Sequence, residues 1–393
     1  MTRRLCIPAL LALAAGLGAA GTALGEGEEE GWSFHPGIRT VLVYDDEANL
    51  GKPGQSNEGD VGFWIKPNVE VGYKTPDLDL GADVGLDLRR YITRDALADE
   101  LIYANAFVEA GLLPGLSVRL ENDLAPQYRQ LGLPEEHGAN LIQANRTDAG
   151  LRYWRELGGN TELEIGGTGT YFLSERFTAG FPSAGGPTFD PNYRATFWQA
   201  TGIADLHRPL GRSLSGHLAT QAGYRDYADG ARADHTNLAM TLGLESERFE
   251  TLELVLEAGY GAILFDGLGT VHQPLGKLSL RHQLPRGFHW SALLANRFRS
   301  NLVGNEVFES AAELGLGKQL GERADASVQG FVARFEDRGA PADFYWGVET
   351  ELGFDLTRQA RLALTYRHWR NTGDAGFDDM AQNAVFASFQ FRH

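Results

Sequence analysis

Alternation of apolar and polar residues is the dominant pattern along this chain. Between Leu78 and Leu88 every second residue is apolar, and the residues between them are aspartates and glycines, with Arg89 following. In an extended strand alternate side chains point to opposite faces, whereas a helix would scatter both sets around its axis. A tilted strand of roughly 9–11 residues crosses a bilayer's hydrocarbon core. The stretch therefore predicts a membrane-spanning strand with one lipid-facing side and one polar side.

Similar segments recur to the C-terminus, separated in turn by short and by longer polar connections. Short turns are predicted near residues 75–77, 114–115, 158–160, 209–212, 246–249, 285–287, 321–323 and 357–360. Longer connections are predicted near residues 45–60, 95–100, 126–138, 174–191, 228–234, 265–269, 301–305, 337–343 and 371–380. Bacterial outer-membrane barrels have short periplasmic turns and longer extracellular loops.

We therefore predict an all-β fold, a transmembrane antiparallel up-and-down β-barrel of about 18 strands, with 16 strands as the alternative. Both termini then lie on the short-turn side. A soluble sandwich or propeller also has many short strands, but it gives no reason for long and short connections to alternate.

The N-terminus has the three parts of a secretory signal peptide. Arg3 and Arg4 precede an apolar run at residues 9–17, and small residues end the segment at Gly25. We predict a signal peptide over residues 1–25, a periplasmic leader over 26–36, and the barrel over 37–393. Cys6 is the only cysteine, so disulfides and zinc–cysteine sites are excluded from the processed chain.

Composition narrows the class further. Absence of an apolar run of 18 or more residues argues against a helical membrane protein, and 49 glycines with 10% aromatic residues suit strands with one lipid face. The net charge of −17 argues against nucleic acid as a partner. We expect the bacterial outer membrane as the location, with lipid and lipopolysaccharide as surroundings. Phe389 and Phe391 in the last strand indicate recognition by the barrel-assembly machinery, although Arg392 and His393 follow them.

If the apolar faces meet lipid, the alternate residues line the lumen. The candidates for the pore lining are Arg281, Arg297, Arg299, Arg225, Asp79, Asp83, Asp87, Glu349, Glu351, Trp154 and Trp198. Arg281, Arg297 and Arg299 are predicted to form a basic stripe, a charged constriction that selects a solute. The alternative is that the charges pair along the wall and rigidify it.

The predicted lumenal aromatic residues and the longest connection each allow two interpretations. Trp154 and Trp198, with Trp64, Tyr103, Phe107 and Trp369, would either stack sugar rings as a slide or pack near the rims. The connection at 174–191, the longest, would either fold into the pore or cover its mouth.

An enzyme is the rival class. Ser215 and His217 share one face of a strand, but same-face neighbours lie about 7 Å apart, beyond direct hydrogen bonding. No Gly-rich phosphate loop, metal-spaced histidine cluster or Gly-x-Ser-x-Gly elbow is present. We therefore predict no catalytic residues, no metal and no cofactor.

Two blocks of the sequence resemble a family of outer-membrane β-barrel porins associated with exopolysaccharide biosynthesis and export. The first is Pro36–Asp46, followed by Ile65–Pro67 and the paired strands to Tyr91; the second is Arg361–Asn371, continuing through Asn383 to Phe391. Such proteins usually have an asparagine after the Tyr-Asp pair, where this chain has Asp46.

The resemblance implies a channel that passes polysaccharide or oligosaccharide across the outer membrane, with a periplasmic export partner. A general diffusion porin and an outer-membrane enzyme are the alternatives. Cargo, direction of transport, an open or plugged pore and oligomeric state are not readable from the residues.

Overall fold

The computed structural model describes residues 30–46, 59–93, 99–128, 141–174, 196–228, 233–249, 251–300, 306–336, 343–372 and 380–392. They form the strands β1 (Gly31–Asp45), β2 (Asp60–Lys74), β3 (Leu78–Tyr91), β4 (Asp99–Leu113), β5 (Leu116–Tyr128), β6 (Leu141–Glu156), β7 (Glu162–Ser174), β8 (Thr196–Pro209), β9 (Ser215–Tyr227), β10 (His235–Phe249), β11 (Leu252–Phe265), β12 (Gly269–Leu284), β13 (Phe288–Ser300), β14 (Glu306–Gln319), β15 (Ala324–Glu336), β16 (Asp343–Asp355), β17 (Ala360–Asn371) and β18 (Met380–Arg392), with the short 3-10 turn η4 (Pro285–Gly287). The predicted signal peptide at 1–25 lies outside the described residues.

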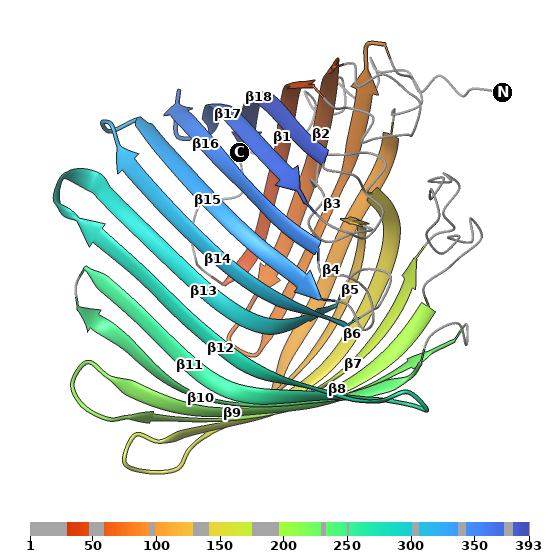
Figure 1. Cartoon of the computed structure of the whole chain (residues 1–393), viewed down its shortest axis with the longest axis vertical. Helices are drawn as coiled ribbons and strands as arrows, with labels where there is room; N and C mark the ends of the chain where they lie inside the picture. Colours follow the sequence, from red (N-terminus) through yellow and green to blue (C-terminus); the bar gives the residue numbers. More distant parts are fainter. Residues whose placement is uncertain are drawn as a thin grey trace.

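The strands form one closed antiparallel sheet. Each strand pairs with its neighbours in sequence, and β1 also pairs with β18, so that Gly37 lies opposite Arg392 and Asp45 opposite Ala384. Figure 1 shows the strands following one another around the barrel in chain order. The predicted up-and-down barrel of 18 strands is confirmed.

Eight short turns join the strands at or within a few residues of their predicted positions, and they share one end of the barrel with the start of β1 and the end of β18. Gly31 pairs with Lys74, which precedes the turn at 75–77. Several boundaries differ from prediction. The turn predicted at 246–249 lies within β10, which continues to Phe249 across a register shift after Ser246, and β5 extends to Tyr128, into the connection predicted at 126–138. β1 begins at Gly31 rather than Gly37, because Trp32 and Phe34 continue the alternation and pair with β2. The connection after Phe265 is a tight turn in which Gly267 and Gly269 have φ of 72° and 89°, so the long connections are not uniformly long.

The two faces of the sheet differ in exposure as well as in chemistry. On β10, Leu238, Met240, Leu242 and Leu244 are exposed, whereas His235, on the other face, is fully buried. Side chains on the concave face of a closed barrel crowd together, and those on the convex face splay apart. The exposed apolar face is therefore the outer surface. None of the helices among the described residues has the length and apolarity needed to cross a membrane.

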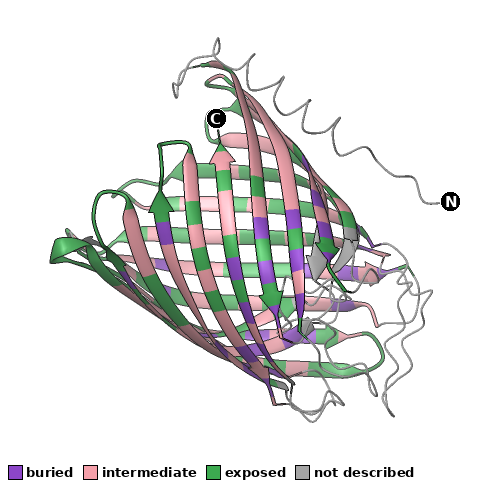
Figure 2. Ribbon diagram, turned by 90° about the horizontal axis from the view of Figure 1, so that it is seen from above, coloured by how far each residue is buried: buried purple, intermediate pink, exposed green. Residues whose placement is uncertain are grey.

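Burial within the barrel is uneven along its axis. Figure 2 shows buried positions concentrated toward one end of the strands. This end carries the longer connections, since Val43, Tyr91, Phe172 and Tyr227 all lie near strand ends that face them. The lumenal side chains at the short-turn end are more exposed. The lumen is thus filled most closely in its long-connection half.

Candidate functional site

The inward face of the barrel, called here the lumenal wall, is the candidate site. Cross-strand register fixes which residues belong to it, because paired residues in an antiparallel sheet point to the same side. Ten of the eleven predicted pore-lining residues share this face: Asp79, Asp83, Asp87, Trp154, Arg225, Arg281, Arg297, Arg299, Glu349 and Glu351. They lie in separate groups along the wall rather than in one site, and six of them form ion pairs: Asp87, Arg281, Arg297, Arg299, Glu349 and Glu351.

The aspartates of β3 differ from one another in their partners. Asp87 is buried and forms ion pairs with Arg89 at 2.7 Å and with Lys66 at 2.8 Å. The Arg89 guanidinium also stacks over the Trp64 ring, 4.7 Å from its centre. Asp83 accepts a hydrogen bond from the Asn68 side chain at 3.2 Å. Asp87 therefore anchors the wall through charge pairing.

Two arginines of the predicted basic stripe share one carboxylate. Arg297 Nε lies 2.5 Å and Arg299 Nη1 3.0 Å from the two oxygens of Glu309 on the next strand. The Glu309 side chain is 3% exposed, whereas those of Arg297 and Arg299 are 48% and 45% exposed. The buried carboxylate holds both guanidinium groups toward the lumen and neutralises only one of their two charges.

In the structure the basic stripe does not include Arg281, so the prediction is wrong for this residue. Arg281 pairs in register with Ser291, six residues before Arg297 on β13, a separation of about 20 Å along an extended strand. Its partner is Glu253 on β11, at 3.7 Å. Periodicity assigns residues to a face but not to a height along the barrel, and for this reason the sequence placed these arginines together.

Carboxylates on β16 also pair with arginines of the neighbouring strand. Arg367 Nε donates to Glu349 at 2.6 Å. Arg361 contacts Glu351 at 3.2 Å, Asp325 at 2.9 Å and Asp355 at 3.1 Å. Much of the wall is thus built of paired charges, as the alternative reading of the sequence expected.

Arg225 lies in the closely filled half of the lumen. It donates to Gln199 at 2.6 Å and 3.0 Å, and its guanidinium lies 4.5 Å from the centre of the Phe197 ring. A third partner is the Tyr227 hydroxyl, at 3.3 Å. Arg225 therefore fixes the packing of β8 against β9 through hydrogen bonds and stacking.

Trp198 does not line the lumen, contrary to the prediction. It pairs in register with Tyr171 and Asp226, which lie on the outer face, and its indole N–H donates to Asp226 at 2.8 Å. Its ring meets that of Tyr224 edge to face at 5.5 Å. An aromatic pair on the outer surface near the strand ends is typical of the girdle at the membrane interface.

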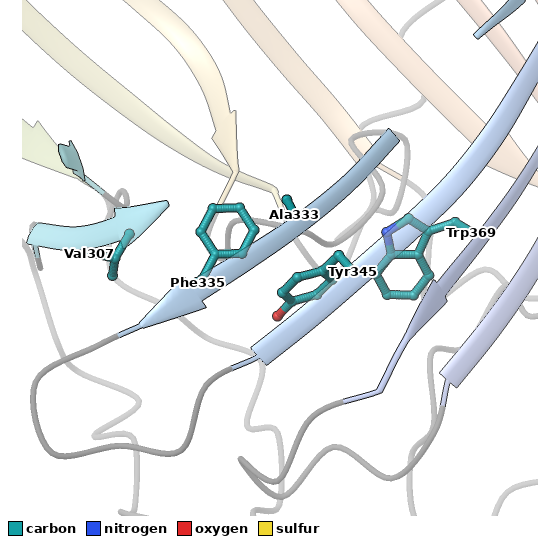
Figure 3. Close-up of a cluster of buried hydrophobic side chains, with 5 residues drawn as sticks. All are labelled: Val307, Ala333, Phe335, Tyr345 and Trp369. Atoms are coloured by element: carbon teal, nitrogen blue, oxygen red, sulfur yellow. The ribbon is translucent and has the colours of Figure 1, made fainter. Parts of the chain in front are cut away.

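Buried aromatic residues line the lumen at the long-connection end. Figure 3 shows one such cluster, in which Phe335, Tyr345 and Trp369 come from three successive strands, with Val307 and Ala333 beside them. Ring centres lie 5.3 Å apart for Phe335 and Tyr345 and 5.9 Å apart for Tyr345 and Trp369. These rings pack against one another, so this part of the wall does not present them as free stacking surfaces.

One group on the wall was missed by sequence reasoning. His217, Glu245 and Glu257 come from β9, β10 and β11, and their ligand atoms all lie within 4.8 Å of one another. No local spacing links them, because each residue is on a different strand. Ser215 Oγ contacts the Glu245 backbone carbonyl at 3.5 Å and His217 Nδ1 contacts the Glu245 carboxylate at 3.4 Å, so this part of the wall contains no Ser–His hydrogen bond.

Comparisons with known proteins agree with this architecture. No protein-family model matches the chain, and no curated protein matches it by sequence. Solved structures do. OccK11 (OpdR) of Pseudomonas aeruginosa is similar with a TM-score of 0.50 and 15% identity, over 94% of this chain and 99% of that one.

Two further structures give the same result. OccAB4 of Acinetobacter baumannii is similar with a TM-score of 0.50 and 11% identity, over 93% of this chain and 99% of that one. OpdK of Pseudomonas aeruginosa, solved with vanillate, is similar with a TM-score of 0.53 and 11% identity, over 92% and 99%. At these identities the likeness concerns the fold.

This is the fold of an outer-membrane porin. The closed sheet, its apolar outer face and its likeness to these barrels place the chain in the bacterial outer membrane, with lipid around it. One of the similar structures is described as an outer membrane protein, OpdK of Pseudomonas aeruginosa, with a TM-score of 0.53 and 10% identity over 92% of this chain and 99% of that one.

Proposed function

We propose that the protein is a passive diffusion channel for small polar solutes across the outer membrane. The observation that carries the proposal is the closed 18-stranded barrel with an apolar exterior and a charged lumenal wall. A wall of charged side chains solvates water and hydrophilic solutes, and an 18-stranded porin barrel is wide enough to enclose an aqueous channel.

The channel should prefer cations. On the lumenal face of the described strands, Asp and Glu outnumber Lys and Arg, and the whole chain carries a net charge of −17. Fixed negative charge along a pore raises the local concentration of cations and lowers that of anions. Around Glu309 the balance is reversed, because Arg297 and Arg299 flank one carboxylate. This pair is the proposed point at which anionic groups of a solute bind.

Export of polysaccharide, which the sequence resemblance implied, has less support. A slide for sugar rings needs a series of exposed lumenal aromatics. Of the predicted set, Trp64 and Trp369 are buried, Trp198 lies outside, Tyr103 and Phe107 are half-buried on the lumenal wall, and Trp154 is exposed there. The name of one similar structure mentions vanillate, a small aromatic carboxylate, and none of the structures reported above is described with a polysaccharide.

Planar bilayer recordings test the proposal. Purified full-length protein should give stable conductance steps. Under a KCl gradient, the sign of its reversal potential should show that K⁺ is more permeant than Cl⁻. Liposome swelling with uncharged sugars of increasing size then measures the limit of diffusion. A barrel without conductance in either assay would contradict an open channel. In a deletion strain, loss of surface polysaccharide with unchanged uptake of small solutes would favour export instead.

A further inference from the structure

His217, Glu245 and Glu257 form a compact mixed-donor group on the lumenal wall, outside the ion pairs described above. In the register, His217 of β9 lies opposite Gly243 of β10, and Gly243 lies opposite Glu257 of β11. Glu245 is the next lumenal residue after Gly243. The three side chains thus converge from three adjacent strands over one glycine.

Gly243 is what allows this convergence. A Cβ added at this position would overlap the ring of His217, so the imidazole occupies the space that any other residue would fill. His217 is buried, with 8% of its side chain exposed, and its Nδ1 lies 3.4 Å from a Glu245 oxygen. The backbone therefore holds the ring between two carboxylates.

The donor set has a definite chemical preference. One imidazole nitrogen and two carboxylate oxygens suit Zn²⁺ and related borderline divalent ions, whereas Mg²⁺ and Ca²⁺ favour all-oxygen sets. Ligand atoms on a tetrahedral zinc at roughly 2.0–2.1 Å are about 3.3 Å apart. The separations here, at most 4.8 Å, approach that arrangement, and small side-chain rotations about Gly243 would complete it. A fourth position would remain open to water from the lumen.

The surroundings supply both a competitor and further donors. Lys277 Nζ lies 3.2 Å from Glu257 and repels a dication. On the other side, His207 lies opposite His217 on the same face, and the Asp205 oxygen Oδ1 is buried without a hydrogen-bond partner among the described residues. Further metal-donor side chains, His207 and Asp205, therefore lie on the β8 side of the group, and a single ammonium, that of Lys277, lies on the β12 side.

We propose that His217, Glu245 and Glu257 bind one Zn²⁺-class divalent cation on the lumenal wall, near the short-turn end of the barrel. The ion joins β9, β10 and β11 through side chains, beyond their backbone ladder, and adds positive charge to an acidic stretch of the pore. The site does not depend on the channel being open, so binding and conductance can be measured separately.

The test uses full-length protein without a polyhistidine tag, in detergent, after treatment with a chelator. Titration with ZnCl₂, by calorimetry and against a fluorescent zinc indicator, should give one site per chain, and excess MgCl₂ should not compete. His217→Ala, Glu245→Gln and Glu257→Gln should each weaken zinc binding at least about tenfold. Glu253→Gln, four residues from Glu257 on the same face of β11, is the matched control and should leave binding unchanged.

Two variants that remove no ligand sharpen the test. Gly243→Ala should weaken binding, because the added methyl displaces the His217 ring. Lys277→Ala should strengthen it severalfold, since the competing ammonium is removed from Glu257. Heat-modifiability on SDS gels verifies that each variant is folded. Wild-type protein that binds no zinc would overturn the proposal, as would equal binding by the wild type and by folded His217→Ala and Glu245→Gln variants.

Discussion

Gln382, on the last strand, donates a hydrogen bond of 2.5 Å to the carboxylate of Asp45, on the first. Both side chains are 5% exposed, and the two residues are 337 positions apart in the chain. They lie at the seam where β1 meets β18 and the barrel closes. Closure therefore uses a buried side-chain contact as well as the backbone ladder.

The first prediction concerns this seam. Gln382→Ala should lower the free energy of unfolding by about 1–3 kcal/mol, because it removes a donor from a buried carboxylate. Urea unfolding in lipid vesicles measures the change. Gln390→Ala alters an exposed residue on the same face of β18 and serves as the control. Equal stability of the two variants would show that the contact contributes nothing to closure.

The seam also explains the two sequence blocks behind the family resemblance. Asp46, at the end of the first block, accepts hydrogen bonds of 2.6 Å from the backbone N–H and from the side chain of Asn383, in the second. Asn383 also accepts one from Tyr366 at 2.8 Å. The blocks are distant in sequence and adjacent in the barrel. Their residues close the sheet, and this role is independent of the cargo.

The second prediction tests the assignment of faces on β3. Ala82 lies on the outer face and Asp83 on the lumenal wall. Ala82→Arg should block assembly, since an arginine facing lipid costs about 2–4 kcal/mol near the midplane. Asp83→Asn keeps an acceptor for Asn68 and should fold normally. Heat-modifiability of the two variants after refolding gives the comparison. If both variants fold equally well, the assignment of the two faces is contradicted.

The strand count and the turns could be predicted because both depend on local signals. Alternation has a period of two in most strands, and several short turns contain Gly, Pro or Asn at the positions that need them, such as Asn160 with φ of 56°. Cross-strand neighbours are different, since they depend on the stagger between strands. Nothing local shows that Glu309 lies between Arg297 and Arg299, or that Gly243 separates His217 from Glu257.

β8 shows why one face was assigned wrongly. Its lumenal side includes Ile203, and its outer side includes Ala200, Gly202 and Ala204, so neither side is clearly the apolar one. Alternation carries no information where both faces mix small and apolar residues. Only pairing with β7 and β9 places Trp198 on the outside.

The third prediction uses this corrected position. Trp198→Phe should reduce the quenching of tryptophan fluorescence by brominated lipid chains, because its ring lies on the outer face. Trp154→Phe should leave lipid quenching unchanged and instead reduce quenching by a water-soluble agent, since Trp154 pairs with Glu164 on the lumenal wall. Spectra of both variants in the same vesicles provide the measurement. If Trp198→Phe instead reduced quenching by the water-soluble agent and left lipid quenching unchanged, Trp198 would lie on the lumenal wall.

The fourth prediction concerns selectivity at Glu309. Replacing Arg297 and Arg299 with serine removes two positive charges from the lumen and should shift the reversal potential further toward cations. The double variant also leaves a 3% exposed carboxylate unpaired by arginine, which lowers stability. Adding Glu309→Gln removes that buried charge, so the triple variant should regain stability and differ from the wild type by one positive charge.

Planar bilayers under a KCl gradient separate the two effects. The triple variant should show a smaller cation shift than the double variant, because its net change is one charge rather than two. Glu309→Gln alone leaves both arginines without their carboxylate and should move the potential toward anions. Were all three variants to share the wild-type reversal potential, permeating ions would not pass close to Arg297 and Arg299, and the point of selection would lie elsewhere along the wall.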